Sequence, residues 1–145
     1  MGSGNSGLFK NTAGARMPRL PVFVGGDYEI KTEQYYIRQY VKGFIKWREL
    51  KLVLKEKNDV LKKSKYGLTI IVDSLDLINQ IKLFEVGRNS VHDLSTWAYV
   101  ILNSDIFCYV KNEEHILKDS MLAILSAKDI ENTFLQKILR RLNEI

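Results

Sequence analysis

The stretch from Thr32 to Arg48 constrains the fold of this chain more than any other part of the sequence, because its apolar residues follow a helical repeat. On a helical wheel they fall within one arc of roughly half the circumference, while Arg38, Lys42 and Lys46 fall on the other half. Thr32 can cap such a helix, since its hydroxyl can accept a hydrogen bond from a backbone N–H of the first turn. We therefore predict one amphipathic helix with these side chains turned inward: Tyr36, Ile37, Tyr40, Val41, Phe44, Ile45 and Trp47.

Two later segments decide between an all-helical fold and a mixed fold. In Leu50–Leu54 every second residue is leucine, which fits a strand as well as a helix, and the good helix formers around it favour the helix. Leu68–Val72 is rich in β-branched residues and is the best strand candidate, with a short buried helix as the alternative. The sequence predicts a mainly α fold, a compact single-domain helical bundle, which becomes an α+β fold if these two segments pair as strands.

The second half of the chain has the spacing of short amphipathic helices joined by tight connections. Asp73 or Ser74 caps the first of them, which Gly87 ends, and Ser90–Asp93 has the sequence of a capping box that opens the next. We expect the inward faces of these two helices to carry Leu77, Ile78, Ile81, Phe84, Val91, Leu94, Trp97, Ala98 and Ile101.

The last third of the chain predicts two more helices. Residues 106–110 fit either a strand or a continued helix. Beyond them we predict a helix capped by Asn112 and a final helix opened by a second capping box, Ser126–Asp129. Arg140 and Arg141 would lie near the negative end of the final helix. The inward residues expected here are Leu117, Met121, Ile124, Leu125, Ile130, Phe134, Leu135, Ile138 and Leu142.

The composition is that of a folded domain. Apolar residues make up 46% of the chain, enough for a core, and no apolar run approaches the roughly 20 residues that span a bilayer. Residues 1–26 are rich in Gly and Ser, contain both prolines and predict a flexible basic arm before a helical domain at residues 27–145. With Cys108 as the single cysteine and no recognisable secretory signal, we expect a reducing, cytoplasmic setting.

Positive charge is concentrated in the first half of the chain. Residues 1–72 carry 14 Lys or Arg and 6 Asp or Glu, whereas residues 73–145 carry 8 and 11. A basic front half can meet anionic lipid or nucleic acid, although a solvated Lys-rich surface explains the same composition. The candidates for such an anionic contact are Arg38, Lys42, Lys46, Lys62, Lys63 and Lys65.

The first six residues match the pattern for N-myristoylation, with Gly2 as the acceptor and Ser6 at the required place. Lys10, Arg16 and Arg19 would add the electrostatic attraction that a single acyl chain needs for stable membrane binding. The same Met-Gly-Ser-Gly start is typical of residues left by an expression vector. A peripheral membrane location is therefore the alternative to a purely cytoplasmic one.

No residue pattern in the chain indicates a catalytic centre, a metal site or a cofactor. His92 and His115, the two histidines, have no Cys or His at metal-ligand spacing, and Cys108 lies in an apolar run typical of a buried cysteine. Asp73 and Asp76 follow a strand-like segment, where acids can bind metal, but helix capping explains them. We predict no catalytic, metal-binding or cofactor-binding residues. A small nuclease using scattered Arg, Tyr and His side chains is the enzymatic alternative.

From about residue 27 onward the chain resembles the poxvirus family of Bcl-like helical immune-evasion proteins. Phe44-Ile45-Lys46-Trp47-Arg48 is similar to the Tyr-Ile-x-Trp-Arg in the first long helix of several members. Val91-His92-Asp93, opening a central apolar helix, and Leu139-Arg140-Arg141-Leu142-Asn143 in the last helix look like that family as well. The segment between Arg48 and His92 is shorter than in the family, by about a helix, and the arm is longer.

The resemblance implies a non-enzymatic intracellular virulence factor that binds and inhibits host signalling or apoptosis proteins and can form a homodimer. The family shares no catalytic residues. Our first functional hypothesis is accordingly a protein-protein interaction module with an unidentified host partner. The alternatives from other classes are an N-myristoylated, membrane-associated matrix-like protein and a small basic toxin-type nuclease, the latter suggested by the pI of about 9.3.

Overall fold

The structure, a computed structural model, describes residues 32–145. These residues are mainly helical with one short pair of parallel strands, so the predicted fold class is confirmed. The predictions for residues 1–31, which include the basic arm and the acylation candidate Gly2, lie outside the described residues. In chain order the elements are α1 (Glu33–Lys42), α2 (Trp47–Leu54), α3 (Lys63–Tyr66), β2 (Ile70–Val72), α4 (Ser74–Glu85), α5 (Val91–Asn103), β3 (Phe107–Tyr109), α6 (Glu114–Ser126) and α7 (Asn132–Asn143).

The helix predicted over Thr32–Arg48 is two helices, α1 and α2, joined by a turn at Gly43. Gly43 has a φ of +91°, a conformation that favours glycine because glycine has no Cβ. The Gly43 N–H donates to the Tyr40 carbonyl at 3.1 Å, and the Phe44 N–H donates to the Gln39 carbonyl at 2.9 Å. This pair of hydrogen bonds closes a helix at a C-terminal glycine. The prediction of one continuous helix was therefore wrong.

The end of α1 also decides which of the predicted inward side chains reach the core. Phe44 is 73% exposed, so its predicted inward position was wrong, because the turn at Gly43 takes it off the buried face of α1. Of the other six residues, three are buried and three are partly exposed while they pack against the core. These are Ile37, Tyr40 and Val41, and Tyr36, Ile45 and Trp47, respectively.

Leu50–Leu54 belongs to α2, so the favoured helix is confirmed for this segment and the strand alternative was wrong. The strand predicted within Leu68–Val72 is β2, but its partner is β3, which lies in the ambiguous residues 106–110. The two strands run parallel, with Ile70 opposite Phe107. A parallel pair needs a long crossover connection, and α4 and α5 supply it here.

Local capping signals set the starts of α4 and α5 as predicted. The Asp76 N–H donates to the Asp73 carboxylate while the Asp73 N–H donates to the Asp76 carboxylate, and Ser90 and Asp93 exchange the same two bonds. Gly87 follows the end of α4, also as predicted. Val91 was expected to point inward and is instead exposed, since it is the first residue of α5 and precedes the buried part of that helix.

Two predicted helix starts in the last third of the chain were wrong. α6 begins after Glu113 rather than at Asn112, and the Glu113 carboxylate accepts a hydrogen bond from the Ser74 N–H at 2.8 Å instead of capping its own helix. Ser126 is the last residue of α6, because the apolar spacing of that helix continues to its end, and α7 begins at Asn132. The second capping box at Ser126–Asp129 is therefore not formed.

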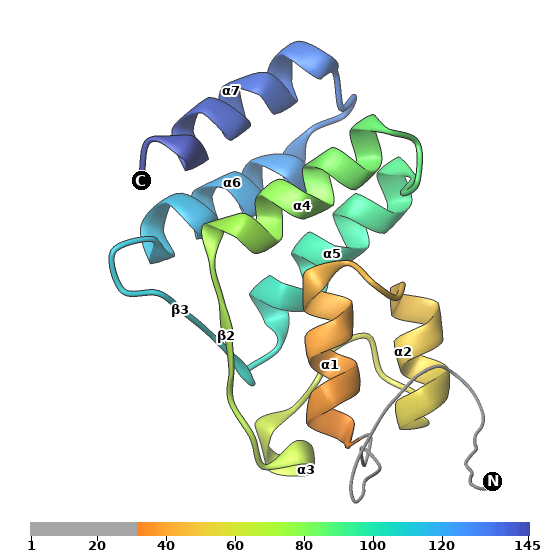
Figure 1. Cartoon of the computed structure of the whole chain (residues 1–145). Coiled ribbons are helices and arrows are strands. Elements are labelled where there is room, and N and C mark those ends of the chain that lie inside the picture. The colour runs from red at the N-terminus through yellow and green to blue at the C-terminus, as the bar shows by residue number, and fades with distance from the viewer. Residues whose placement is uncertain (1–31) are drawn as a thin grey trace, which may run out of the picture. The chain divides into compact units, whose positions relative to one another are not determined.

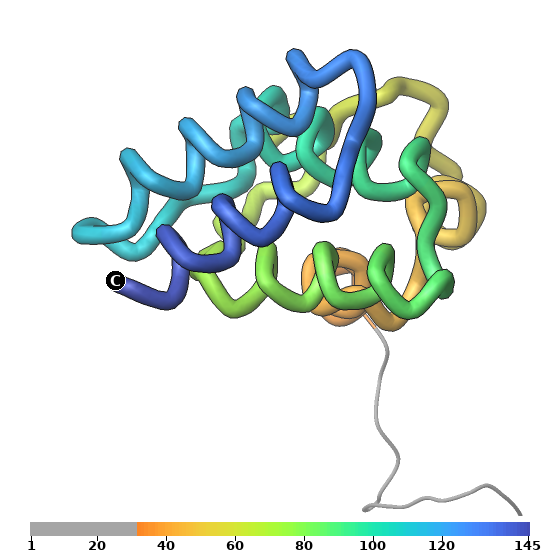
Figure 2. Tube along the Cα trace, turned by 90° about the horizontal axis from the view of Figure 1, so that it is seen from above, coloured from red at the N-terminus to blue at the C-terminus, as the bar shows by residue number. Residues whose placement is uncertain are grey.

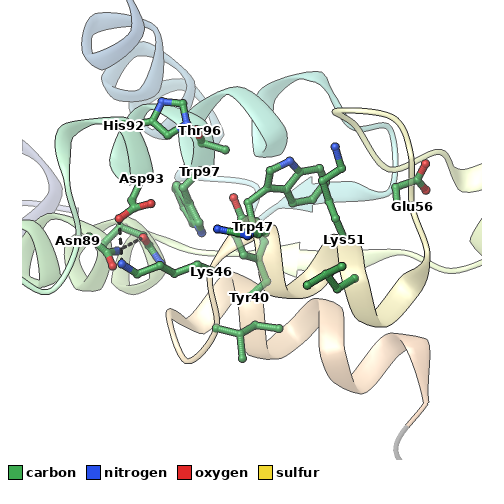
Figure 3. Close-up of a pocket in the computed structure, with 14 residues that line it drawn as sticks. Tyr40, Lys46, Trp47, Lys51, Glu56, Asn89, His92, Asp93, Thr96 and Trp97 are labelled. Atoms are coloured by element: carbon green, nitrogen blue, oxygen red, sulfur yellow. Dashed lines mark hydrogen bonds and ion pairs between the residues drawn. The ribbon is translucent and has the colours of Figure 1, made fainter.

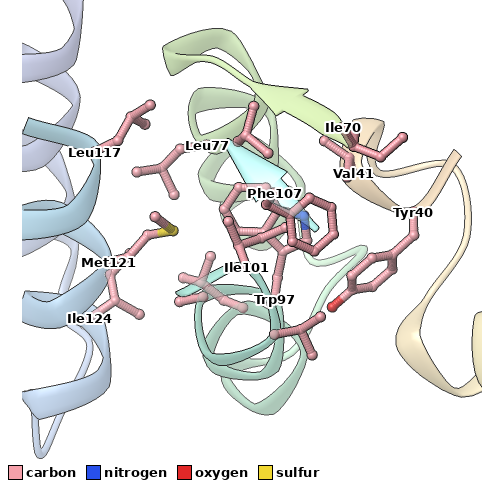
Figure 4. Packing of buried hydrophobic residues seen from close by; sticks show 14 of the residues in the cluster. Tyr40, Val41, Ile70, Leu77, Trp97, Ile101, Phe107, Leu117, Met121 and Ile124 are labelled. Carbon is pink, nitrogen blue, oxygen red and sulfur yellow. The ribbon is translucent and has the colours of Figure 1, made fainter. Parts of the chain in front are cut away.

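Helices α4, α5, α6 and α7 pack on one another, and α1 and α2 pack against α4 and α5, as Figures 1 and 2 show from two directions. Aliphatic side chains fill the space between these helices. In Figure 4, Leu117, Met121 and Ile124 of α6 face Leu77 of α4 and Ile101 of α5. Within residues 32–145, no helix combines the length and the apolar character needed to cross a bilayer.

Candidate functional site

A pocket of about 660 Å³ lies where α1 and α2 face the α4–α5 connection and the first half of α5 (Figure 3). The turn at Gly43 places the start of α2 on one side of this pocket, and the capping box at Ser90 fixes the start of α5 on the other. Its size falls within the range of about 300–1,000 Å³ that is usual for ligand sites. The lining residues are Tyr40, Ile45, Lys46, Trp47, Arg48, Lys51, Leu52, Glu56, Gln80, Asn89, His92, Asp93, Thr96 and Trp97.

Three aromatic side chains form the centre of the pocket. The ring centroids of Tyr40 and Trp47 are 5.5 Å apart, with 50° between the ring planes, and Trp97 comes from α5 on the opposite side (Figure 3). Tyr40 is 3% exposed and Trp97 is 1% exposed, whereas Trp47 is partly open. Trp47 and Trp97 are the two tryptophans of the chain, so both indole rings of this protein line one pocket.

Two polar atoms of these rings are buried without a hydrogen-bond partner: Oη of Tyr40 and Nε1 of Trp97. The Tyr40 ring extends from α1 with its hydroxyl end toward α5 (Figure 4). Burial raises the pKa of Tyr40, and the nearby Asp93 carboxylate raises it further, so its hydroxyl keeps its proton at neutral pH. Both atoms have almost no exposed surface, so they lie behind the wall of the pocket and not at its open side. An unsatisfied buried polar group is costly, at about 1–3 kcal/mol each.

The acidic residues of the pocket are already paired. The Lys46 ammonium lies 3.1 Å from the Asp93 carboxylate. Burial opposes ionisation of Asp93, but hydrogen bonds from the Ser90 N–H and from Lys46 outweigh it and lower the pKa of Asp93. Glu56 is buried and accepts hydrogen bonds from the Tyr66 hydroxyl, the Asn58 N–H and the Lys65 ammonium. These bonds outweigh burial and lower the pKa of Glu56 to about 2.

The basic residues at the opening are less fully paired. Among the residues that the structure describes, Arg48 is exposed and makes no ion pair or hydrogen bond through its side chain. Lys51 lies with Nζ 5.9 Å from the centre of the Trp47 ring, and its one acidic partner, Asp59, is 3.3 Å away and mostly exposed. Leu52, beside them, is 71% exposed. The opening therefore combines an apolar side chain with one cation, Arg48, that has no acidic partner among the described residues and a second, Lys51, that is held in a solvent-exposed ion pair.

The six basic residues predicted as an anionic-surface contact do not form one uniform patch. Lys42, Lys46 and Lys65 are each bound to an acid, namely Asp76, Asp93 and Glu56. Arg38, Lys62 and Lys63 are exposed and, within residues 32–145, their side chains form no ion pair, although the backbone N–H of Lys63 donates to the Asp105 carboxylate. Three of the six predicted cations are thus neutralised by ion pairs within the chain. Of the six, only Lys46 lines the pocket.

The other predicted candidates are placed apart from one another. His92 is exposed at the edge of the pocket, 3.4 Å from the Thr96 hydroxyl, and His115 lies 3.3 Å from Asp119 on α6. Cys108 lies on β3 and is partly buried. Within the described part of the chain, no three His, Cys, Asp or Glu residues gather in a way that could hold a metal ion.

Sequence reasoning did not find this pocket. The sequence predicts Tyr40 and Trp47 as parts of one inward helical stripe and Trp97 as part of another. A usable signal was the chemistry of these residues, because a buried Tyr or Trp normally needs a partner for its O–H or N–H. Comparisons with protein-family models, with curated proteins and with solved structures find no match. What can be said of function therefore depends on the pocket itself.

Proposed function

We propose that this protein is a non-enzymatic protein-protein interaction module and that the pocket between α2 and α5 is its binding surface. The observation that carries the proposal is a pocket lined by aromatic side chains, with the exposed Leu52 and the exposed Arg48 at its opening. Buried aromatic anchors surrounded by a charged rim are the usual make-up of an energetically important interface region.

The resemblance to the poxvirus Bcl-like family extends this proposal to the class of partner. On that basis the partner is a host signalling or apoptosis protein, the setting is cytoplasmic, and self-association of the module is part of the same hypothesis. An anionic lipid or nucleic-acid partner is less well supported, since three of the six candidate cations are neutralised by buried or half-buried acids.

The test compares three baits in affinity capture from eukaryotic cell lysate: the unaltered protein, Leu52→Asp and Leu122→Asp. Leu52 lines the pocket opening, whereas Leu122 is exposed on α6 and lies outside the pocket, so both variants place a carboxylate on already exposed surface. We expect a protein that is retained by the unaltered bait and by Leu122→Asp and is lost with Leu52→Asp. The captured protein is then produced in pure form, and direct binding is measured with the same three variants.

Three results would count against the proposal. Equal retention of every captured protein by Leu52→Asp would show that the pocket is not the binding surface. Hydrolysis of RNA or plasmid DNA by the purified protein with Mg²⁺ would instead favour the nuclease alternative. Acylated Gly2 together with vesicle binding at low salt would favour the matrix-like alternative.

A further inference from the structure

The charges and the apolar walls of the pocket point to a particular ligand chemistry. We propose that the pocket binds a short acidic segment of a partner protein, which inserts one aliphatic side chain beside the partly open Trp47 and places a carboxylate at Arg48 and Lys51. This inference rests on the proposed interaction function and goes beyond it by naming the chemistry of the bound segment.

The walls of the pocket select the aliphatic side chain. Tyr40, Trp47 and Trp97 form its centre, and Ile45 and Leu52 add apolar surface near the opening. An aliphatic group removed from water against these rings gains free energy in proportion to the apolar area that it buries. A charged side chain in the same place would lose its hydration without gaining a partner.

The balance of charge at the opening favours an acidic segment. Asp93 forms an ion pair with Lys46. Glu56 forms an ion pair with Lys65 and accepts a hydrogen bond from Tyr66, so neither acid needs a cation from a ligand. Arg48 has no acidic partner among the described residues, and the acid that pairs with Lys51 is exposed to solvent. An arginine side chain can bind a carboxylate through two parallel N–H bonds, which makes Arg48 the stronger of the two contacts.

The same residues disfavour a nucleic-acid base as the occupant. Base stacking needs an open ring face on the protein surface. Trp97 and Tyr40 are almost fully buried, and the partly open Trp47 already has Tyr40 and Lys51 against it. We therefore expect side-chain insertion rather than stacking.

The experiment uses a phage-displayed library of random heptapeptides, selected against the full chain. We expect enriched peptides to contain Leu, Ile or Val next to Asp or Glu. The consensus peptide is then synthesised without tryptophan and titrated against the protein by tryptophan fluorescence. Because both tryptophans of the chain line the pocket, any change in their emission reports directly on the site.

Two matched pairs of variants test the contacts. Arg48→Glu should weaken the consensus peptide by about tenfold or more, whereas Arg38→Glu, an equal charge change at an exposed site on α1, should leave its affinity unchanged. Leu52→Asp should weaken binding several-fold by placing a carboxylate beside the bound acidic segment, whereas Leu122→Asp, on exposed surface of α6 outside the pocket, should leave the affinity unchanged.

Three outcomes would overturn the inference. The first is a library selection that yields no sequence preference or a basic one. The second is equal affinity of the consensus peptide for Arg48→Glu and Arg38→Glu. The third is a fluorescence change with an eight-residue oligothymidylate and none with the peptide. In the first two cases the interaction function still stands if the Leu52→Asp bait loses its captured partner, so the two failures can be told apart.

Discussion

Nζ of Lys42, at the end of α1, lies 2.8 Å from Oδ1 of Asp76, a carboxylate that is 1% exposed in the first turn of α4. Burial raises the pKa of Asp76, and the hydrogen bond from Lys42 opposes that rise. The other oxygen of Asp76 accepts from the Asp73 N–H, so the carboxylate satisfies both the cap of α4 and the cation of α1. This contact joins the first helix of the described chain to the helical core.

Replacing Lys42 by Ala should therefore lower the free energy of unfolding by about 1–3 kcal/mol, because Oδ1 of Asp76 stays buried without its donor. Arg38→Ala is the control, since it removes the same charge from α1 at an exposed position without an acidic partner in residues 32–145. It should change stability by less than about 0.5 kcal/mol. Urea unfolding followed by circular dichroism measures both, and equal losses would show that the Lys42–Asp76 contact does not stabilise the fold.

Gly43→Ala should be more damaging than the same change at Gly67. Both glycines have positive φ, which costs an L-residue about 1–2 kcal/mol. A Cβ at Gly43 would also lie 2.7 Å from Cδ1 of Leu83 on α4, whereas a Cβ at Gly67 meets no atom within 4 Å. The difference between the two midpoints of thermal unfolding measures the steric cost at Gly43 together with the added cost of its larger φ, +91° against +65° at Gly67. Equal midpoints would mean that α4 yields to the added methyl group without loss of stability.

Glu56 should make the stability of the fold depend on pH. Its pKa in the folded chain is about 2, against an ordinary value of 4.5. The unfolded chain therefore takes up a proton first as the pH falls, and the stabilisation by Glu56, fully present above pH 4.5, is lost between that value and about pH 2. We expect Glu56→Gln to show a smaller fall in the free energy of unfolding over this interval than the unaltered protein. Parallel pH curves for the two proteins would contradict the assignment.

Two tyrosine-to-phenylalanine substitutions should change the free energy of unfolding in opposite directions. Tyr40→Phe removes a hydroxyl that has no hydrogen-bond partner and should raise the free energy of unfolding by about 1 kcal/mol. Tyr66→Phe removes the hydroxyl that donates to the buried Glu56 and should lower it by about 1–3 kcal/mol. Chemical denaturation of the two variants gives the comparison. A loss of stability in Tyr40→Phe would indicate that this hydroxyl is already satisfied in the free protein.

The parts of the fold that could be predicted from sequence are those fixed by neighbouring residues. The reciprocal bonds of Asp73 with Asp76 and of Ser90 with Asp93 are each made within one turn, so the starts of α4 and α5 follow from the local sequence. Ser126–Asp129 offers a similar pattern that is not used, because the apolar face of α6 continues as far as Ser126.

The parts that could not be predicted depend on contacts between distant segments. A glycine inside an amphipathic pattern can either continue a helix or end it, and at Gly43 the close packing of Leu83 and Gln80 of α4 accompanies the ending. The partner of β2 lies beyond two helices, and no local signal identifies it. The pocket was missed for the same reason, since Tyr40 and Trp97 come from different helices and meet only in the folded chain.

The parallel pairing of β2 with β3 has a consequence for the order in which the protein is made. When β2 leaves the ribosome its partner has not been synthesised, and the pair can close only after α4, α5 and β3 have all emerged. Until then the nascent chain presents an unpaired strand of three apolar residues, Ile70–Val72, next to a half-built core. The contacts of α1 with α4 and of α2 with α5 also form only after those later helices have emerged, so the partly made chain leaves apolar surface open to aggregation or to chaperone binding.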